Sequence, residues 1–143
     1  MYRRNASGGI EVLLAHPGGP YWQRKDAGAW TLPKGEYEDP EEPLAAALRE
    51  WAEETGFAAV PPFIPLGEVK QAGGKRITAW AFQGDCDPHA LKCNTFEIEW
   101  PPKSGQRQSF PEIDRVHWFE LAEARERLNP AQAAFLERLE RLV

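Results

Sequence analysis

The sequence predicts a single α+β domain over residues 1–143, from its length, its composition and its mixed periodicity. A chain of 143 residues is long enough to bury most of the surface that it exposes when unfolded. Its content of 42% hydrophobic and 27% charged residues is ordinary for a soluble globular protein. The apolar run Ile10–His16 is typical of a buried strand, whereas Leu44–Thr55 has helical periodicity. Both element types therefore contribute to one core.

The charge balance limits the partners that the chain is expected to bind. A net charge of -5 argues against binding to polymeric nucleic acid or to a membrane surface. Arg3 and Arg4 resemble the start of a signal peptide, but no apolar core follows them and no run is long enough to span a bilayer. Two cysteines fit a reducing compartment, so we expect a cytoplasmic protein. Cys86, His89 and Cys93 lack the fourth ligand that structural zinc requires.

The sequence before residue 34 predicts strands separated by turns. Ile10–His16 is the buried strand, and the Pro17–Pro20 cluster then turns the chain. Around them we expect an earlier strand at Tyr2–Arg4, a surface loop at Tyr21–Gly28 and a short strand at Trp30–Leu32.

The sequence after the central helix predicts further strands and then two helices. Val60–Pro62 forbids continuation of the helix, because proline lacks an amide hydrogen. The expected elements are a hairpin of Ile64–Lys70 and Arg76–Gln83, a loop at 84–92, a half-exposed strand Asn94–Trp100, a polar loop Pro101–Pro111, a strand Val116–Phe119 and a helix Leu121–Leu128. Pro130 suits the first turn of a final helix with an apolar stripe of Ala134, Phe135, Leu139 and Leu142.

The central helix carries three carboxylates on one face. At about 100° per residue, Glu53 and Glu54 fall within roughly 60° of Glu50, on either side of it. Mostly apolar residues fall on the opposite flank, which we expect to pack against a sheet: Leu44, Leu48, Trp51, Ala52 and Thr55. Gly56 is placed to end the helix.

Two interpretations of this acidic face remain open from spacing alone. Like charges three and four residues apart repel by a few tenths of a kcal/mol per pair, which a solvated helix tolerates. A divalent cation would remove the repulsion, because Mg²⁺ prefers carboxylate oxygens and completes its shell with water and substrate phosphates. Arg49 borders the face and can orient one carboxylate by a bidentate contact.

A longer pattern favours the metal site. From Gly35 to Phe57 the chain reads G-x5-E-x7-R-E-U-x-E-E-x-G-U, where U is an apolar residue. This resembles the complete Nudix box of the Nudix hydrolase superfamily, with a bulkier Trp51 at an aliphatic position. The resemblance implies an α/β/α sandwich around a mixed sheet, and hydrolysis of a nucleoside diphosphate linked to a second moiety with Mg²⁺ or Mn²⁺.

The resemblance also implies roles for individual residues. The metal ligands would be Glu50, Glu53, Glu54 and the carbonyl of Gly35. Arg49 and Glu41 would hold the loop–helix–loop in shape, with Gly56 at the helix end. The base that takes a proton from the attacking water would be Glu53 or a later acid, for which Glu112 is the candidate.

The substrate predictions rest on less specific sequence features outside the box. Lys34 precedes the box, as in diadenosine polyphosphate and diphosphoinositol polyphosphate hydrolases, and would neutralise an additional phosphate. A tyrosine that many diadenosine polyphosphate hydrolases carry after the box is replaced by Gly74. The chain also resembles small bacterial proteins described as nucleoside triphosphate pyrophosphohydrolases. The further candidates for phosphate or base contacts are Arg24, Lys75, Arg76 and Phe110.

Three functional hypotheses follow. The first is a pyrophosphohydrolase of diadenosine polyphosphates or related nucleotides, acting as a monomer or homodimer on a small-molecule substrate. The second is a house-cleaning enzyme for oxidised or non-standard nucleoside triphosphates. The third is a non-catalytic nucleotide-sensing module, which the retained carboxylates disfavour.

Overall fold

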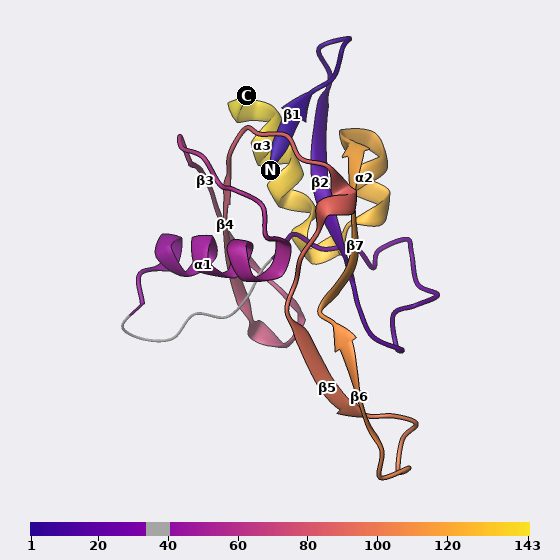
Figure 1. Cartoon of the computed structure of the whole chain (residues 1–143). Coiled ribbons are helices and arrows are strands. Elements are labelled where there is room, and N and C mark those ends of the chain that lie inside the picture. The colour runs from indigo at the N-terminus through magenta and orange to yellow at the C-terminus, as the bar shows by residue number, and fades with distance from the viewer. Residues whose placement is uncertain (34–40) are drawn as a thin grey trace.

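A computed structural model describes residues 1–33 and 41–143, with α1 between the first two strands and the later strands, and with α2 and α3 after the last strand (Figure 1). The strands are β1 Tyr2–Arg4, β2 Ile10–Pro17, β3 Ile64–Lys70, β4 Arg76–Ala81, β5 Thr95–Glu99, β6 Arg107–Pro111 and β7 Ile113–Glu120. The helices are α1 Pro43–Thr55, α2 Leu121–Arg127 and α3 Ala133–Leu142. The predicted α+β class is confirmed.

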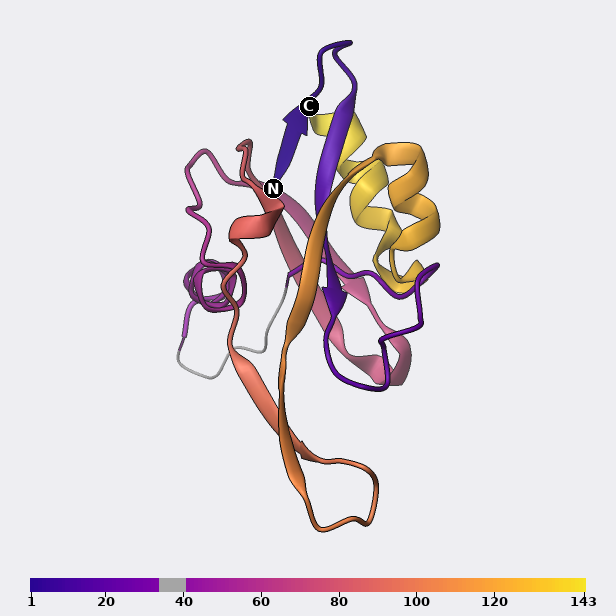
Figure 2. The same cartoon turned by 45° about the vertical axis from the view of Figure 1, so that its right-hand side comes forward.

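The strands lie between helices, with α1 on one side and α2 and α3 on the other (Figure 2). Alternation along β2 explains how one strand serves both sides, because successive side chains point to opposite faces. Val12 and Leu14 pack in the cluster that contains residues of α2 and α3. Leu13 and Ala15 pack in the cluster that contains Trp51 of α1. The apolar run of β2 is thus buried on both faces.

The sheet is more fragmented than the expected single mixed sheet. The described residues form antiparallel sheets in the orders β1-β2-β7, β3-β4 and β5-β6. Parallel pairing occurs only as the isolated bridges Tyr2↔Gln83 and Trp30↔Leu128 within the described ranges. The first of these bridges connects β1 to the segment after β4. Because β1 has only three residues, no longer parallel ladder forms there.

Two predictions for strands were wrong. Pro101–Pro111 is not entirely a loop, because its end forms β6 and pairs with β5. The resulting ribbon projects from the body of the molecule, so β6 has too few buried residues to show a strand-like pattern (Figure 1). Conversely, Trp30–Leu32 forms only isolated bridges, through Trp30 and Thr31.

The C-terminal helix begins later than predicted and buries a different set of residues. Pro130–Gln132 forms a separate 3₁₀ turn, and α3 starts at Ala133. Phe135 and Leu139 are buried as expected, and Leu136 is buried as well, but Leu142 is 55% exposed. Periodicity identifies the apolar face of a helix but not where its neighbours stop covering that face.

Among the helices that the structure describes, none has both the length and the apolar character needed to cross a membrane.

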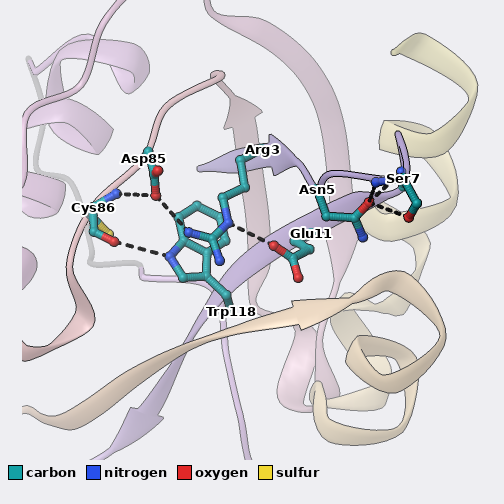
Figure 3. Close-up of polar contacts among 8 residues, drawn as sticks. Arg3, Asn5, Ser7, Glu11, Asp85, Cys86 and Trp118 are labelled. Carbon is teal, nitrogen blue, oxygen red and sulfur yellow. Dashed lines mark hydrogen bonds and ion pairs between the residues drawn. The ribbon is translucent and has the colours of Figure 1, made fainter.

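A polar cluster lies across the three strands of the β1-β2-β7 sheet, beside the loop after β4 (Figure 3). The guanidinium of Arg3 lies 4.1 Å from the ring centroid of Trp118. Its nitrogens donate to Glu11 at 2.8 Å and to Asp85 at 2.7 Å. The Trp118 indole donates to the Cys86 carbonyl at 3.3 Å. These contacts tie residues 85–86 to strands that lie far from them in the sequence.

Asp26 makes folding stability dependent on pH. Its carboxylate accepts hydrogen bonds from Arg127 and, at 2.7 Å, from the Trp30 indole. Both bonds, first that of Arg127, hold the pKa of Asp26 below its usual range. A depressed folded-state pKa contributes stability above the unfolded pKa that is lost as pH falls through the folded value. We expect Asp26→Asn to lower the melting temperature at pH 7, with the difference from wild type shrinking below about pH 4.

Thermal unfolding between pH 7 and pH 3 measures this dependence. Glu120→Gln is a suitable control because the Glu120 side chain makes no capping hydrogen bond to α2. If the melting temperatures of wild type and Asp26→Asn differed by the same amount at every pH, the stabilising role of the Asp26 carboxylate would be contradicted.

Candidate active site

Helix α1 has defined signals at both ends. The Glu42 carboxylate accepts from the amides of Leu44, at 3.1 Å, and Ala45, at 2.9 Å, and Pro43 follows it at the first helical position. Sequence reasoning missed this cap because glutamate is not among the usual capping residues. Gly56 ends the helix with φ 72°, and its amide donates to Ala52, as the sequence predicted.

Arg49 binds three of the carboxylates that the sequence pattern identifies as candidates. Its Nε and Nη2 donate to the two oxygens of Glu41, at 2.8 and 2.9 Å. Nη1 donates to Glu50 at 2.9 Å and to Glu53 at 3.2 Å. These contacts, first that of Glu41, raise the pKa of the guanidinium further above its usual range. The ion pairs offset the mutual repulsion of the glutamates, and they orient Glu50 and Glu53 relative to one another.

The burial of α1 differs from the helical-wheel expectation. Trp51 and Thr55 are buried as predicted, whereas Ala52 is exposed. Glu54, placed by the wheel on the acidic outer face, is only 7% exposed. The wheel takes account of the helix alone, but residues 92–94 dock on its last turn, where the Lys92 amide donates to the Thr55 carbonyl at 3.0 Å. A segment so distant in sequence could not be placed from the period of α1.

Backbone hydrogen bonds connect the two candidate bases. The Asn94 amide donates to the Glu53 carbonyl at 3.1 Å, and the Asn94 carbonyl accepts from the Glu112 amide at 2.9 Å. The Glu112 carbonyl in turn accepts from the Gly18 amide at 2.9 Å. Glu112, between β6 and β7, is therefore fixed relative to the end of α1. Sequence reasoning missed the role of Asn94, which has no local signal.

A cavity of about 690 Å³ lies against α1 and β4. Predicted site residues at its border are Glu50, Glu54, Glu112, Lys75 and Arg76. Other predicted residues lie elsewhere: Arg24 is exposed in the loop before Trp30, and Phe110 packs on Phe96 with a centroid distance of 6.2 Å. Lys34 and Gly35 fall outside the described residues. The arrangement combines acidic side chains and the basic side chains of Lys75 and Arg76 around a space large enough for a small molecule.

The donor chemistry of the α1 carboxylates suits a hard divalent cation. Glu50, Glu53 and Glu54 supply only oxygen atoms from one helical segment, which Mg²⁺ prefers. Within residues 1–33 and 41–143, no three Asp, Glu, His or Cys side chains lie close enough together to hold a metal ion. Cys86, His89 and Cys93 therefore do not form such a group either. Arg49 currently binds Glu50 and Glu53, so a cation there would share these carboxylates with the guanidinium.

Comparison with known proteins identifies a family for this chain. A family model described as "NUDIX domain" matches residues 1–139. No curated protein matches the chain significantly by sequence. Among solved structures, a Caenorhabditis elegans Ap4A hydrolase binary complex is similar, with a TM-score of 0.67 and 20% identity over 98% of this chain and 91% of that chain.

Two further solved structures share the fold. The MutT protein from Methanosarcina mazei Go1 has a TM-score of 0.58 and 24% identity, over 98% of this chain and 88% of that one. The NUDIX domain of Shewanella oneidensis NrtR, complexed with ADP ribose, has a TM-score of 0.65 and 20% identity, over 99% and 83%. The structural likenesses show the common fold, and the family match over 1–139 shows that this chain belongs to the Nudix family of pyrophosphohydrolases.

Proposed function

We propose that the chain hydrolyses a pyrophosphate bond in a nucleoside diphosphate linked to a second moiety, and that it depends on Mg²⁺ or Mn²⁺. The observation that carries this proposal is that acids from distant parts of the chain line the same cavity. Glu50 and Glu54 of α1 border it together with Glu112, although Glu112 lies far from α1 in sequence. The backbone of Asn94 connects Glu53 to Glu112. Such a set can hold a cation, a phosphate chain and a water within one space.

The metal would be held by the carboxylates of Glu50, Glu53 and Glu54, with the Gly35 carbonyl as a further ligand. When bound, a divalent cation would neutralise phosphate charge and lower the pKa of an attacking water. Arg49 is the positioning residue, because its guanidinium holds Glu50 and Glu53 while Glu41 anchors its other edge. The water's proton would be taken by Glu53 or by Glu112, both carboxylates within this arrangement.

For the substrate, we propose a nucleotide with an extended phosphate chain, of the diadenosine polyphosphate type. Lys75 and Arg76 border the cavity and supply positive charge for additional phosphates. Lys34 would contribute in the same way. The fold shared with a protein named Ap4A hydrolase is compatible with this choice.

A nucleotide panel assayed with Mg²⁺, Mn²⁺ or EDTA tests the function. Diadenosine tetraphosphate should yield ATP and AMP. A triphosphate converted to monophosphate and pyrophosphate would instead support the house-cleaning alternative. If no nucleotide in the panel were hydrolysed under any condition while some still bound, the catalytic proposal would be wrong and the sensing module would replace it.

Arg49→Lys tests the positioning role. A lysine retains the charge but lacks the planar fork that binds Glu41 with two bonds and still reaches Glu50 and Glu53. We expect kcat to fall about 10-fold or more, in the range seen for residues that orient ligands, with a smaller change in KM. Steady-state kinetics and a melting curve measure the two effects. Equal kcat values for Arg49→Lys and wild type would contradict the role.

A further inference from the structure

His16, near the end of β2, is fully buried and has a hydrogen-bond partner at each ring nitrogen. Nδ1 lies 2.9 Å from a carboxylate oxygen of Asp114, and Nε2 lies 2.7 Å from the carbonyl oxygen of Lys25. An ionised carboxylate and a backbone carbonyl only accept hydrogen bonds. Both contacts are therefore hydrogen bonds at the same time only when the ring carries two hydrogens, as the imidazolium.

The neighbours of the His16 ring supply a counter-charge and no hydrogen of their own. Trp30 packs edge-on against the ring at a centroid distance of 5.1 Å, but its indole donates to Asp26. Arg115 lies 3.5 Å from the carboxylate of Asp114. A carboxylate beside a buried cation offsets part of the cost of removing that cation from water. The charged groups on the surrounding elements are Asp114 and Arg115 of β7, Lys25 and Asp26 of the loop after β2, and Arg127 of α2, which binds Asp26.

Asp114 lies at an irregularity in the pairing of β2 with β7. His16 pairs with Arg115, whereas the next residue, Pro17, pairs with Ile113, so Asp114 is an extra residue on β7. Such a bulge bends its strand and redirects a side chain. The ring of His16 binds this extra residue to β2, and its other nitrogen binds the loop that follows β2. One buried side chain thus connects three segments.

The bulge is adjacent to Glu112, which borders the cavity. Glu112 precedes Asp114 by two residues, and its carbonyl accepts from the amide of Gly18, two residues after His16, at 2.9 Å. The two backbones are in close contact, because a Cβ added to Gly18 would stand 1.9 Å from the carbonyl oxygen of Pro111. In a close-packed region, a movement of the bulge would therefore be transmitted to Glu112.

We propose that His16 is a positioning residue for Glu112, which it holds at the cavity by binding Asp114 and Lys25 with its two ring hydrogens. This inference rests on the proposed function, because Glu112 is one of its two candidate bases. Loss of a ring hydrogen would leave a nitrogen lone pair facing an acceptor oxygen, so one of the two bonds would be lost. The alignment of Glu112 is therefore complete while the ring is doubly protonated, and it weakens as pH rises.

Nitrogen-15 NMR of labelled histidine tests the ring without any turnover. The chain has three histidines, and the resonances of His16 are those that disappear in His16→Gln. At about pH 6, wild type should show two slowly exchanging ring N–H groups for His16, because both hydrogens are buried and bonded. A single ring N–H for His16 under these conditions would overturn the proposal.

A double-mutant cycle tests whether His16 acts through Glu112. His16→Gln should lower kcat about 10-fold, because a glutamine amide has donors on one atom only and its oxygen would face the other acceptor. The Mn²⁺ affinity should not change, since the α1 carboxylates are not touched. In the Glu112→Gln background the same substitution should cause no further loss, because the carboxylate that it positions is already neutralised. Equal losses in both backgrounds would show a general structural effect and would overturn the proposal.

Asp114→Asn provides a second variant that does not depend on the folding of His16→Gln. It keeps the shape of a side chain that is 25% exposed but removes the counter-charge of the ring. We expect it to lower kcat about fivefold, as for the loss of one hydrogen bond, and again only when Glu112 is present. His117→Gln is the matched control, because His117 is an exposed histidine of β7 that pairs with Leu14 of β2. Its kcat should equal that of wild type.

The outcomes separate this inference from the proposed function. If nucleotides are hydrolysed while His16→Gln or Asp114→Asn folds and retains the wild-type kcat, the positioning role is overturned and the proposed function stands. If Glu112→Gln also retains the wild-type kcat, Glu53 is the base and nothing remains for His16 to position. If no nucleotide is hydrolysed, the proposed function fails, and the positioning role fails with it whatever the NMR spectrum shows.

Discussion

Glu53→Gln should lower kcat by about 100-fold or more, the effect expected when a base or a metal-bound carboxylate is neutralised. The Glu53 side chain is 41% exposed and accepts from Arg49 at 3.2 Å. An amide oxygen can accept the same bond, so folding should be preserved while negative charge is lost. Steady-state hydrolysis of the best nucleotide from the panel, with Mg²⁺ at saturation, measures the change.

Glu137→Gln on α3 provides the matched control for Glu53→Gln. Glu137 is also an exposed helical glutamate with an arginine four residues away, but Arg141 lies at the outer limit of an ion pair, 4.0 Å. Its substitution should leave kcat within experimental error. Glu112→Gln, assayed alongside, identifies the base: loss of the acidic limb of the pH profile in one variant assigns the proton transfer to that residue. Wild-type rates in both Glu53→Gln and Glu112→Gln would remove both from the reaction.

Gly18→Ala should have the largest effect on stability. A Cβ at Gly18 would stand 1.9 Å from the Pro111 carbonyl oxygen and 2.9 Å from its carbon, so the backbone of one of the two segments must move. The Gly18 amide also donates to the Glu112 carbonyl at 2.9 Å. We expect a loss of about 3 kcal/mol in the free energy of unfolding, the upper end for overpacking, and reduced activity because Glu112 is displaced. Urea denaturation measures the loss.

Gly84→Ala controls for the general cost of replacing a glycine. A Cβ there would meet the nearest Met1 side-chain atoms at 3.4 Å, which is ordinary contact with a flexible side chain. Its effect should be small, about 1 kcal/mol at most in either direction. Similar unfolding free energies for Gly18→Ala and Gly84→Ala would show that the loop at Gly18 moves without cost, against the expectation.

The sequence predicts the elements whose signals are local. β2 has a dense apolar run and α1 has apolar periodicity with Gly56 at its end, so both were found. β6 was missed because a ribbon that projects into solvent needs backbone pairing but little apolar pattern. The start of α3 was displaced because Pro130 opens a 3₁₀ turn before the helix rather than its first turn.

The candidate site, like the fold, is predictable from sequence only where its contacts are local. The pattern along α1 identifies Arg49, Glu50 and Glu53, since helical neighbours follow from spacing. The position of Glu112 relative to α1 depends on the segment around Asn94, which reaches α1 only after the chain has folded back. No local pattern encodes those contacts.

The central claim is that the α1 carboxylates form a divalent-metal site, and titration with Mn²⁺ followed by electron paramagnetic resonance tests it most directly. Wild type should bind Mn²⁺ at a saturable site, and Glu54→Gln should bind it about 10-fold more weakly or worse, with the Glu137→Gln control unchanged. The same Mn²⁺ affinity in wild type and Glu54→Gln would remove Glu54 from the ligand set. No saturable Mn²⁺ binding by wild type, with or without a nucleotide present, would contradict the metal site itself.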